Sequence, residues 1–298
     1  MTTSPLRMEN TQAPRKRIRV PRVQPPTGAT DCHFHIFGPH ARYPLSSGRA
    51  YTPLEATMAD YAAITDTLGI DRFVVVQPSI YGTDNSCSLD AVAAWGQNRA
   101  RAVAVIDDSF DGPALRRLHG AGVRGVRFNA VSGNGTPLDQ LQMLAGRAAE
   151  FGWHIQLYLR GEALPELASR LIELPVPVVI DHMGQVATAK GTGHPEFQAL
   201  LRLLGSGRAW VKLCGYRSSS AGYPFHDVAD QARALIAVAP RRCLWGTDWP
   251  HPNFFGTMPD DGELLDLLGD WAPDEATRQS ILVGNPAELY GFDGREDR

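Results

Sequence analysis

The sequence has few cysteines and no long apolar segment. Its four cysteines lie far apart and form no Cys-x-x-Cys pair, which argues against a disulfide scaffold or a zinc ribbon. No apolar run approaches the roughly 20 residues that a membrane-spanning helix needs. The N-terminal region also lacks the apolar core of a signal peptide. We therefore expect a reduced, cytoplasmic protein without membrane contact.

An excess of charge of one sign is also absent. The chain has 29 basic and 32 acidic residues, for a net charge of −3, so it offers no basic field for nucleic acid. Hydrophobic residues make up 43% and charged residues 20%, which is the balance of a globular protein. We expect a small molecule as the partner, and a homo-oligomer is compatible with this composition.

Residues 1–28 differ from the rest of the chain. They are polar, rich in proline and without periodicity, and residues 15–19 concentrate positive charge. The composition predicts a mobile basic arm. The alternative is an arm that packs on the domain or on a neighbouring subunit. Residues 29–298 then form a single catalytic domain.

From residue 29 onward, short apolar runs alternate with amphipathic segments. The runs are rich in β-branched residues and nearly continuous in hydrophobicity, as in strands buried on both faces. Strands are expected over 29–35, 72–77, 101–106, 125–129, 154–158, 176–181, 209–214 and 243–246. Helices are expected over 61–68, 115–121, 138–151, 164–174, 196–204 and 228–239. This alternation predicts an α/β fold, a single (β/α)8 TIM barrel. A doubly wound sheet is the alternative, but no Gly-x-Gly-x-x-Gly follows an early strand.

Polar residues gather at the ends of the predicted strands, where a TIM barrel places its active site. His33 and His35 lie two residues apart on one strand, so both side chains are expected to project into the barrel mouth. Two imidazoles on one side can hold a divalent metal or polarise an oxygen atom. The other strand ends add Ser79, Arg127, Asn129, Tyr158, His182, Arg217 and Asp248. Convergence from strands so far apart in the sequence predicts an enzyme site.

Three strings resemble motifs of the amidohydrolase superfamily: Asp31–His35, Val178–Gly184 and Gly246–Asn253. They are similar to those of the 2-pyrone-4,6-dicarboxylate lactonases and the related sulfomuconolactone hydrolases. The likeness runs from Gly28 to about Tyr290. It implies an amidohydrolase-type TIM barrel that hydrolyses lactones in the catabolism of aromatic compounds.

The resemblance also implies roles for four residues at the barrel mouth. Asp248 would be the general base that takes a proton from water. His33, His35 and His182 would donate hydrogen bonds to the substrate carbonyl oxygen. Alternatively, His33, His35 and Asp248 would hold one zinc ion that polarises this oxygen, although the resembling lactonases need no metal. We expect Asp248 to be a partly exposed residue of the rim.

The family's substrate-binding positions correspond here to Arg127, Arg217, Tyr51, Ser79, Tyr158 and Asn253. A planar guanidinium pairs with a carboxylate through two hydrogen bonds, which favours an anionic substrate. Arg127 and Tyr158 stand where binuclear relatives keep metal ligands, and neither side chain can bridge two cations. A centre with two metal ions is therefore not expected.

One segment departs from the pattern of the pyrone lactonases. After the Arg-Phe-Asn string they carry a basic pair, whereas Ala130–Asn134 contains no cation. A carboxylate left unpaired in a dry pocket is costly. We therefore predict a hydrolase of a carboxylated or sulfonated lactone, of the muconolactone or sulfomuconolactone type. The alternatives are a 2-pyrone-4,6-dicarboxylate lactonase proper, or a sugar-acid lactone isomerase or decarboxylase on the same barrel.

Overall fold

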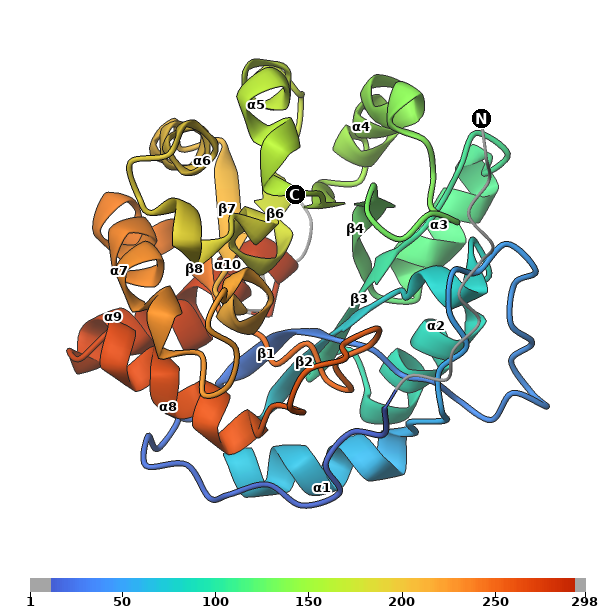
Figure 1. Cartoon of the computed structure of the whole chain (residues 1–298). Coiled ribbons are helices and arrows are strands. Elements are labelled where there is room, and N and C mark those ends of the chain that lie inside the picture. The colour runs from blue at the N-terminus through green and yellow to red at the C-terminus, as the bar shows by residue number, and fades with distance from the viewer. Residues whose placement is uncertain (1–11, 293–298) are drawn as a thin grey trace, which may run out of the picture.

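Eight parallel strands form a ring at the centre of the structure, a computed structural model that describes residues 12–292 (Figure 1). The strands are β1 (Thr30–Phe34), β2 (Arg72–Val76), β3 (Ala100–Ala104), β4 (Val123–Asn129), β5 (His154–Tyr158), β6 (Val178–Ile180), β7 (Ala209–Lys212) and β8 (Cys243–Leu244). Each strand pairs in parallel with the next one along the chain. The predicted (β/α)8 barrel is confirmed.

The ring closes where the chain after β8 meets β1. The Cys32 N–H donates to the Trp245 carbonyl oxygen at 2.9 Å, and the Asp248 N–H donates to the His33 carbonyl oxygen at 2.7 Å. These backbone bonds continue the parallel pattern beyond the last residue of β8. They carry Asp248 directly across the carboxyl end of β1.

The buried carboxylate of Asp31 stabilises this closure through hydrogen bonds. Its two oxygens accept hydrogen bonds from the backbone N–H and the hydroxyl of Thr247, at 3.1 and 2.6 Å. Oδ2 also accepts from the Tyr61 hydroxyl at 2.8 Å, and Oδ1 accepts from the backbone N–H of His33 at 2.9 Å. One side chain thus joins β1, the first helix and the segment after β8.

Helices surround the ring (Figure 1). They are α1 (Met58–Leu68), α2 (Ser86–Trp95), α3 (Gly112–Gly120), α4 (Leu141–Ala149), α5 (Leu164–Ile172), α6 (Pro195–Gly205), α7 (Ala229–Val238), α8 (Asp261–Trp271), α9 (Glu275–Gln279) and α10 (Asn285–Tyr290). The helix α1 begins with a capping box, in which Thr57 and Asp60 satisfy each other's backbone N–H groups. No helix within residues 12–292 is long and apolar enough to cross a membrane.

All the predicted helices are present, whereas α2 and α8–α10 were not predicted. The apolar pattern of α8 is interrupted because this helix buries Asp261 and Asp266 together with its leucines. The helix α2 consists largely of small residues, which give a weak amphipathic pattern. Tertiary burial therefore determines these helices more than sequence periodicity does.

The segment Arg19–Val23 packs on α8. The Asp266 carboxylate accepts hydrogen bonds from the backbone N–H groups of Arg22 and Val23, at 2.6 and 3.1 Å. It also pairs with the guanidinium of Arg19 at 2.5 Å. Over these residues the arm packs on the domain, because the buried carboxylate of Asp266 pairs with the guanidinium groups of Arg19 and Arg22. Residues 1–11 of the expected mobile arm lie outside the described residues.

Substitution of Asp266 should release this arm. We expect Asp266→Ala to lower the free energy of unfolding by about 1–3 kcal/mol, because several donors lose a buried acceptor. Limited trypsin digestion should cut after Arg19 and Arg22 faster than in the wild type. The control is Asp270→Ala, since that carboxylate is 47% exposed and approaches Arg22 only at 3.5 Å. Equal protection in the two variants would contradict the anchoring role of Asp266.

Candidate active site

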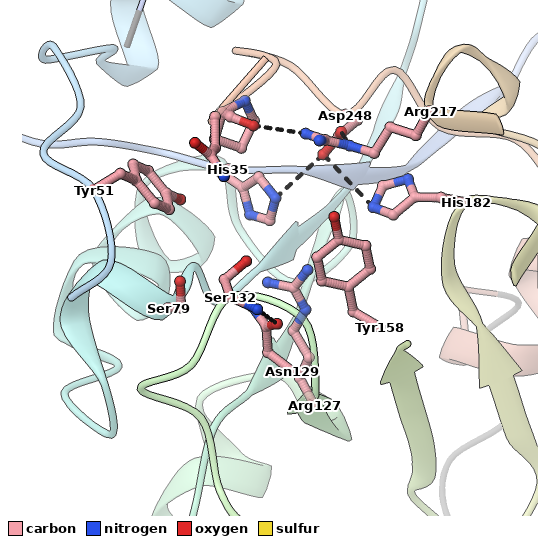
Figure 2. A pocket seen from close by; sticks show the side chains of 12 residues that line it. His35, Tyr51, Ser79, Arg127, Asn129, Ser132, Tyr158, His182, Arg217 and Asp248 are labelled. Carbon is pink, nitrogen blue, oxygen red and sulfur yellow. Dashed lines mark hydrogen bonds and ion pairs between the residues drawn. The ribbon is translucent and has the colours of Figure 1, made fainter. Parts of the chain in front are cut away.

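A pocket opens at the carboxyl ends of the strands (Figure 2). Nine of the ten residues with a predicted catalytic or substrate-binding role line it: His35, Tyr51, Ser79, Arg127, Tyr158, His182, Arg217, Asp248 and Asn253. Asn129, Ser132 and Pro252 complete the wall. The tenth, His33, is fully buried directly beside the pocket, next to Asp248. The convergent polar groups are those of a small-molecule site.

The side chain of Asp248 stands at the centre of three histidines. Its Oδ1 atom lies 3.3 Å from Nε2 of His35, 3.6 Å from Nε2 of His33 and 4.0 Å from Nε2 of His182. Figure 2 shows His35 and His182 facing this carboxylate from two sides. The expectation of a partly exposed aspartate is wrong. Asp248 is only 1% exposed, because barrel closure turns it inward beneath the loop after β7.

The other carboxylate oxygen of Asp248 is held by two donors. Oδ2 accepts hydrogen bonds from the Tyr216 hydroxyl and from Nε of Arg217, both at 2.5 Å. Burial by itself would raise the pKa of Asp248, but the positive charge of Arg217 holds this pKa well below its usual range. Asp248 is thus a carboxylate with Oδ2 fixed. Within residues 12–292, Oδ1 has no hydrogen-bond partner.

Tyr216 is a site residue that the sequence analysis missed. It precedes Arg217 in the segment after β7, where a buried aromatic residue is indistinguishable from a core residue. Arg217, predicted to bind substrate, lines the pocket but also donates to the Pro252 carbonyl oxygen at 2.8 Å. Much of its hydrogen-bonding capacity is therefore used to hold the base and the loop.

The histidines around Asp248 are neutral. Burial lowers the pKa of His33 well below 6.5 and lowers that of His35, and it lowers the pKa of His182 to about 3. Nδ1 of His35 lies 2.7 Å from the carbonyl oxygen of Val76. A carbonyl only accepts, so this nitrogen carries the hydrogen and Nε2 turns a lone pair toward Asp248.

A buried cation forms the opposite wall. Arg127 on β4 is 3% exposed, donates to the Gln77 carbonyl oxygen at 2.9 Å and lies over the ring of Tyr158. Its Nε atom has no hydrogen-bond partner within the described chain and is 3.6 Å from the Asp181 carboxylate. A fixed guanidinium with unused donors attracts an anionic group of a ligand.

The segment that lacks the basic pair is held by neutral groups. The side-chain oxygen of Asn129 accepts from the backbone N–H groups of Val131 and Ser132, at 3.1 and 2.9 Å. The Asn134 amide donates to the Ser79 carbonyl oxygen at 2.5 Å. No cation from this loop lines the pocket, which matches the departure seen in the sequence.

The distances at Asp248 suit one zinc ion. Donor atoms of His33, His35 and Asp248 lie within 4.8 Å of one another. Neighbouring ligands of tetrahedral zinc, each about 2.0–2.1 Å from the metal, stand about 3.3 Å apart. The outer contact of His35 also fits, since a metal-bound histidine donates its other N–H to a carbonyl or a carboxylate. At His33 two groups compete for Nδ1, since the Asp181 carboxylate and the amine of Lys212 both lie 3.2 Å from it.

A family model described as amidohydrolase matches residues 30–292. The chain belongs to the amidohydrolase family. The resemblance drawn from the motifs at β1, β6 and β8 is thereby confirmed. In this amidohydrolase, those motifs supply His33, His182 and Asp248 to one pocket.

Relatives of this amidohydrolase match it over nearly its whole length. A 2-pyrone-4,6-dicarboxylate hydrolase of Comamonas testosteroni is 42% identical over 282 residues, which are 91% of this chain and 92% of the relative. A 4-sulfomuconolactone hydrolase of Hydrogenophaga intermedia is 41% identical over 287 residues, 93% of each chain. An apo crystal structure from Agrobacterium tumefaciens is 34% identical, with a TM-score of 0.84, and covers 91% of this chain and 98% of its own. The two hydrolases differ in their named substrates.

Gly246 provides a test of how the amidohydrolase positions this site. A Cβ atom there would lie 2.7 Å from Cβ and 2.8 Å from the backbone nitrogen of His33. We expect Gly246→Ala to lower the free energy of unfolding by about 1–3 kcal/mol through overpacking, measured by urea denaturation. The control is Gly146→Ala in α4, where a Cβ meets nothing within 4 Å and should stabilise the helix. An equally stable Gly246→Ala protein would show that the closure tolerates a side chain.

Proposed function

We propose that this amidohydrolase hydrolyses an anionic lactone, carboxylated or sulfonated, in the catabolism of aromatic compounds. The observation that carries the proposal is the free Oδ1 of Asp248, buried among neutral histidines. Arg127 on the opposite wall offers an anion site in the same pocket. The two hydrolase relatives above support a lactone as the substrate.

Asp248 acts on the attacking water. A lactone is an internal ester, so water must add to its carbonyl carbon while the ring C–O bond breaks. Oδ1 of Asp248 takes one proton from the water and then delivers it to the departing ring oxygen. Tyr216 and Arg217 hold Oδ2, so that Oδ1 stays aimed into the pocket. The products are the carboxylate of the opened acid, its new hydroxyl group and one proton.

The three histidines have different roles in this reaction. N–H groups of His33 and His182 stabilise the negative charge that develops on the carbonyl oxygen. His35 presents a lone pair, so it accepts a hydrogen bond from the water instead of donating to the carbonyl. A zinc ion held by His33, His35 and Asp248 would supply Lewis-acid polarisation of the same oxygen.

The acidic group of the substrate pairs with Arg127. Neutral donors from Tyr51, Ser79, Tyr158 and Asn253 orient the ring around this ion pair. Isomerisation or decarboxylation on the same barrel is the alternative chemistry. Lactone hydrolysis consumes water and releases a proton, whereas decarboxylation releases carbon dioxide, so product analysis separates them. The cytoplasmic location and a homo-oligomer stay predictions.

Substitution of the base tests this assignment. Asp248→Asn should reduce kcat by about 10²–10⁴-fold, because the amide cannot take a proton from water. The matched control is Asp261→Asn, an equally buried carboxylate that contacts His251 at 3.2 Å outside the pocket. Circular dichroism should report a native fold for both. A loss of less than about tenfold at Asp248 would remove it from the role of sole base.

The missing basic pair predicts the substrate preference. The pyrone carries two ring carboxylates. Of the two arginines that line the pocket, Arg217 already donates to Asp248 and to the Pro252 carbonyl oxygen. An unpaired carboxylate costs roughly 2–5 kcal/mol. This cost corresponds to about 30- to 5000-fold in kcat/KM at ~1.4 kcal/mol per decade. We therefore expect 2-pyrone-4,6-dicarboxylate to be turned over far more slowly than a five-membered muconolactone. A kcat/KM for the pyrone near 10⁵ M⁻¹s⁻¹ or above, well within the ordinary enzymatic range, would contradict this preference.

A further inference from the structure

Lys212 is a fully buried lysine that the proposed mechanism has not used. It ends β7, inside the barrel and beneath the pocket. Its amine lies 2.7 Å from Oε1 of Gln156, 3.2 Å from Nδ1 of His33 and 3.6 Å from Oδ1 of Asp181. A fully buried lysine requires a counter-ion and hydrogen-bond acceptors. These three neighbours supply them.

The surrounding network fixes the orientation of this lysine. Nε2 of Gln156 donates to Oδ2 of Asp181 at 3.1 Å, so Oε1 of the same amide is turned toward Lys212. Asp181 also faces Nε of Arg127 at 3.6 Å. Lys212 and Arg127 each place a cationic nitrogen 3.6 Å from the Asp181 carboxylate. Asp181 is therefore the buried anion that balances Lys212.

We propose that Lys212 is a positioning residue that fixes the tautomer of His33 and thereby makes His33 the donor to the lactone carbonyl. Oδ1 of Asp181 is also 3.2 Å from Nδ1, but within residues 12–292 it makes no hydrogen bond, whereas the Lys212 amine does. An ammonium group has three hydrogens and no lone pair, so it can only donate to Nδ1. The single hydrogen of the neutral imidazole is then on Nε2. That atom lies 3.6 Å from Oδ1 of Asp248 and, within residues 12–292, has no hydrogen-bond partner. This inference rests on the proposed lactone hydrolysis.

The two histidines of the His-x-His pair consequently carry opposite tautomers. The Val76 carbonyl places the hydrogen of His35 on Nδ1, whereas Lys212 places that of His33 on Nε2. Their rings are 5.1 Å apart, and both Nε2 atoms face Asp248. One histidine therefore donates to the carbonyl oxygen, and its neighbour accepts from the water. Two side chains that are two residues apart in the chain thus act on the carbonyl oxygen and on the attacking water.

The same contact works against a zinc ion at His33. Zinc binds the lone pair of an imidazole nitrogen, so binding at Nε2 would move the hydrogen to Nδ1. That hydrogen would then point at the ammonium of Lys212, 3.2 Å away. Lys212 and a zinc ion thus demand different tautomers of His33. Lys212 favours the form that polarises a carbonyl without a metal.

Nitrogen NMR of histidine-labelled, metal-free protein tests the tautomer directly. In the wild type the His33 signals, assigned by their loss in His33→Gln, should be those of an Nε2–H imidazole. In Lys212→Met the hydrogen should move to Nδ1 and donate to Asp181, whose Oδ1 is 3.2 Å away. Competition with a chelator should then show zinc bound at least about tenfold more tightly than by the wild type, since Nε2 offers its lone pair.

Kinetics of the metal-free enzyme provide the second readout. Loss of one donor to the developing oxyanion should lower kcat of Lys212→Met by about 10²–10³-fold, with KM little changed. The control is Lys190→Met, the same substitution at a partly exposed lysine paired with Glu196 at 2.7 Å. It should alter neither the tautomer, the zinc affinity nor kcat.

An Nδ1–H form of His33 in the wild type would overturn the proposal, and this measurement needs no folded Lys212 variant. Unchanged tautomer and zinc affinity in Lys212→Met would overturn it as well. If the wild type opens no lactone, the proposed function fails, whereas the spectra and zinc titrations still decide the role of Lys212.

Discussion

The closure of the barrel between β8 and β1 is the constraint on which the site depends. The strand β8 ends at Leu244. The backbone of the segment that follows it hydrogen-bonds directly to β1, at Cys32 and His33. Gly246 permits this approach because a side chain would meet His33. Asp31 then ties the segment down through Thr247. Without this junction Asp248 would not face the histidines.

Two buried carboxylates balance the positive charges of the side chains near that junction. Asp248 is held on one side by Arg217, so one oxygen stays available for a proton. Asp181 balances Lys212 and approaches Arg127. Each anion is thus stabilised by a cation that leaves part of the site free: Oδ1 of Asp248 for water, and the guanidinium of Arg127 for an acidic group. Burial makes this pairing necessary, since an unpaired charge inside the barrel would be unstable.

Much of the fold could be predicted because a parallel barrel places its strands in chain order. Buried strands show as continuous apolar runs, and each run ends in the residue that faces the pocket. The ends of these apolar runs therefore identified Arg127, Tyr158 and His182 from the sequence. It did not identify α8, whose burial of acids hides its periodicity, nor the packing of the basic arm on that helix. Both depend on pairing between segments more than 240 residues apart.

The sequence by itself determined which chemical groups stand at the strand ends, and hence the family and the kind of pocket. Only the tertiary structure decided what each group can do. The burial of Asp248, its contact with Tyr216 and the opposite hydrogen-bonding partners of His33 and His35 all arise from distances across the barrel. The types of the residues and their spacing specify which hydrogen-bonding groups are present at the site. Which nitrogen carries the hydrogen depends on the neighbour that lies within about 3 Å, and the fold supplies that neighbour.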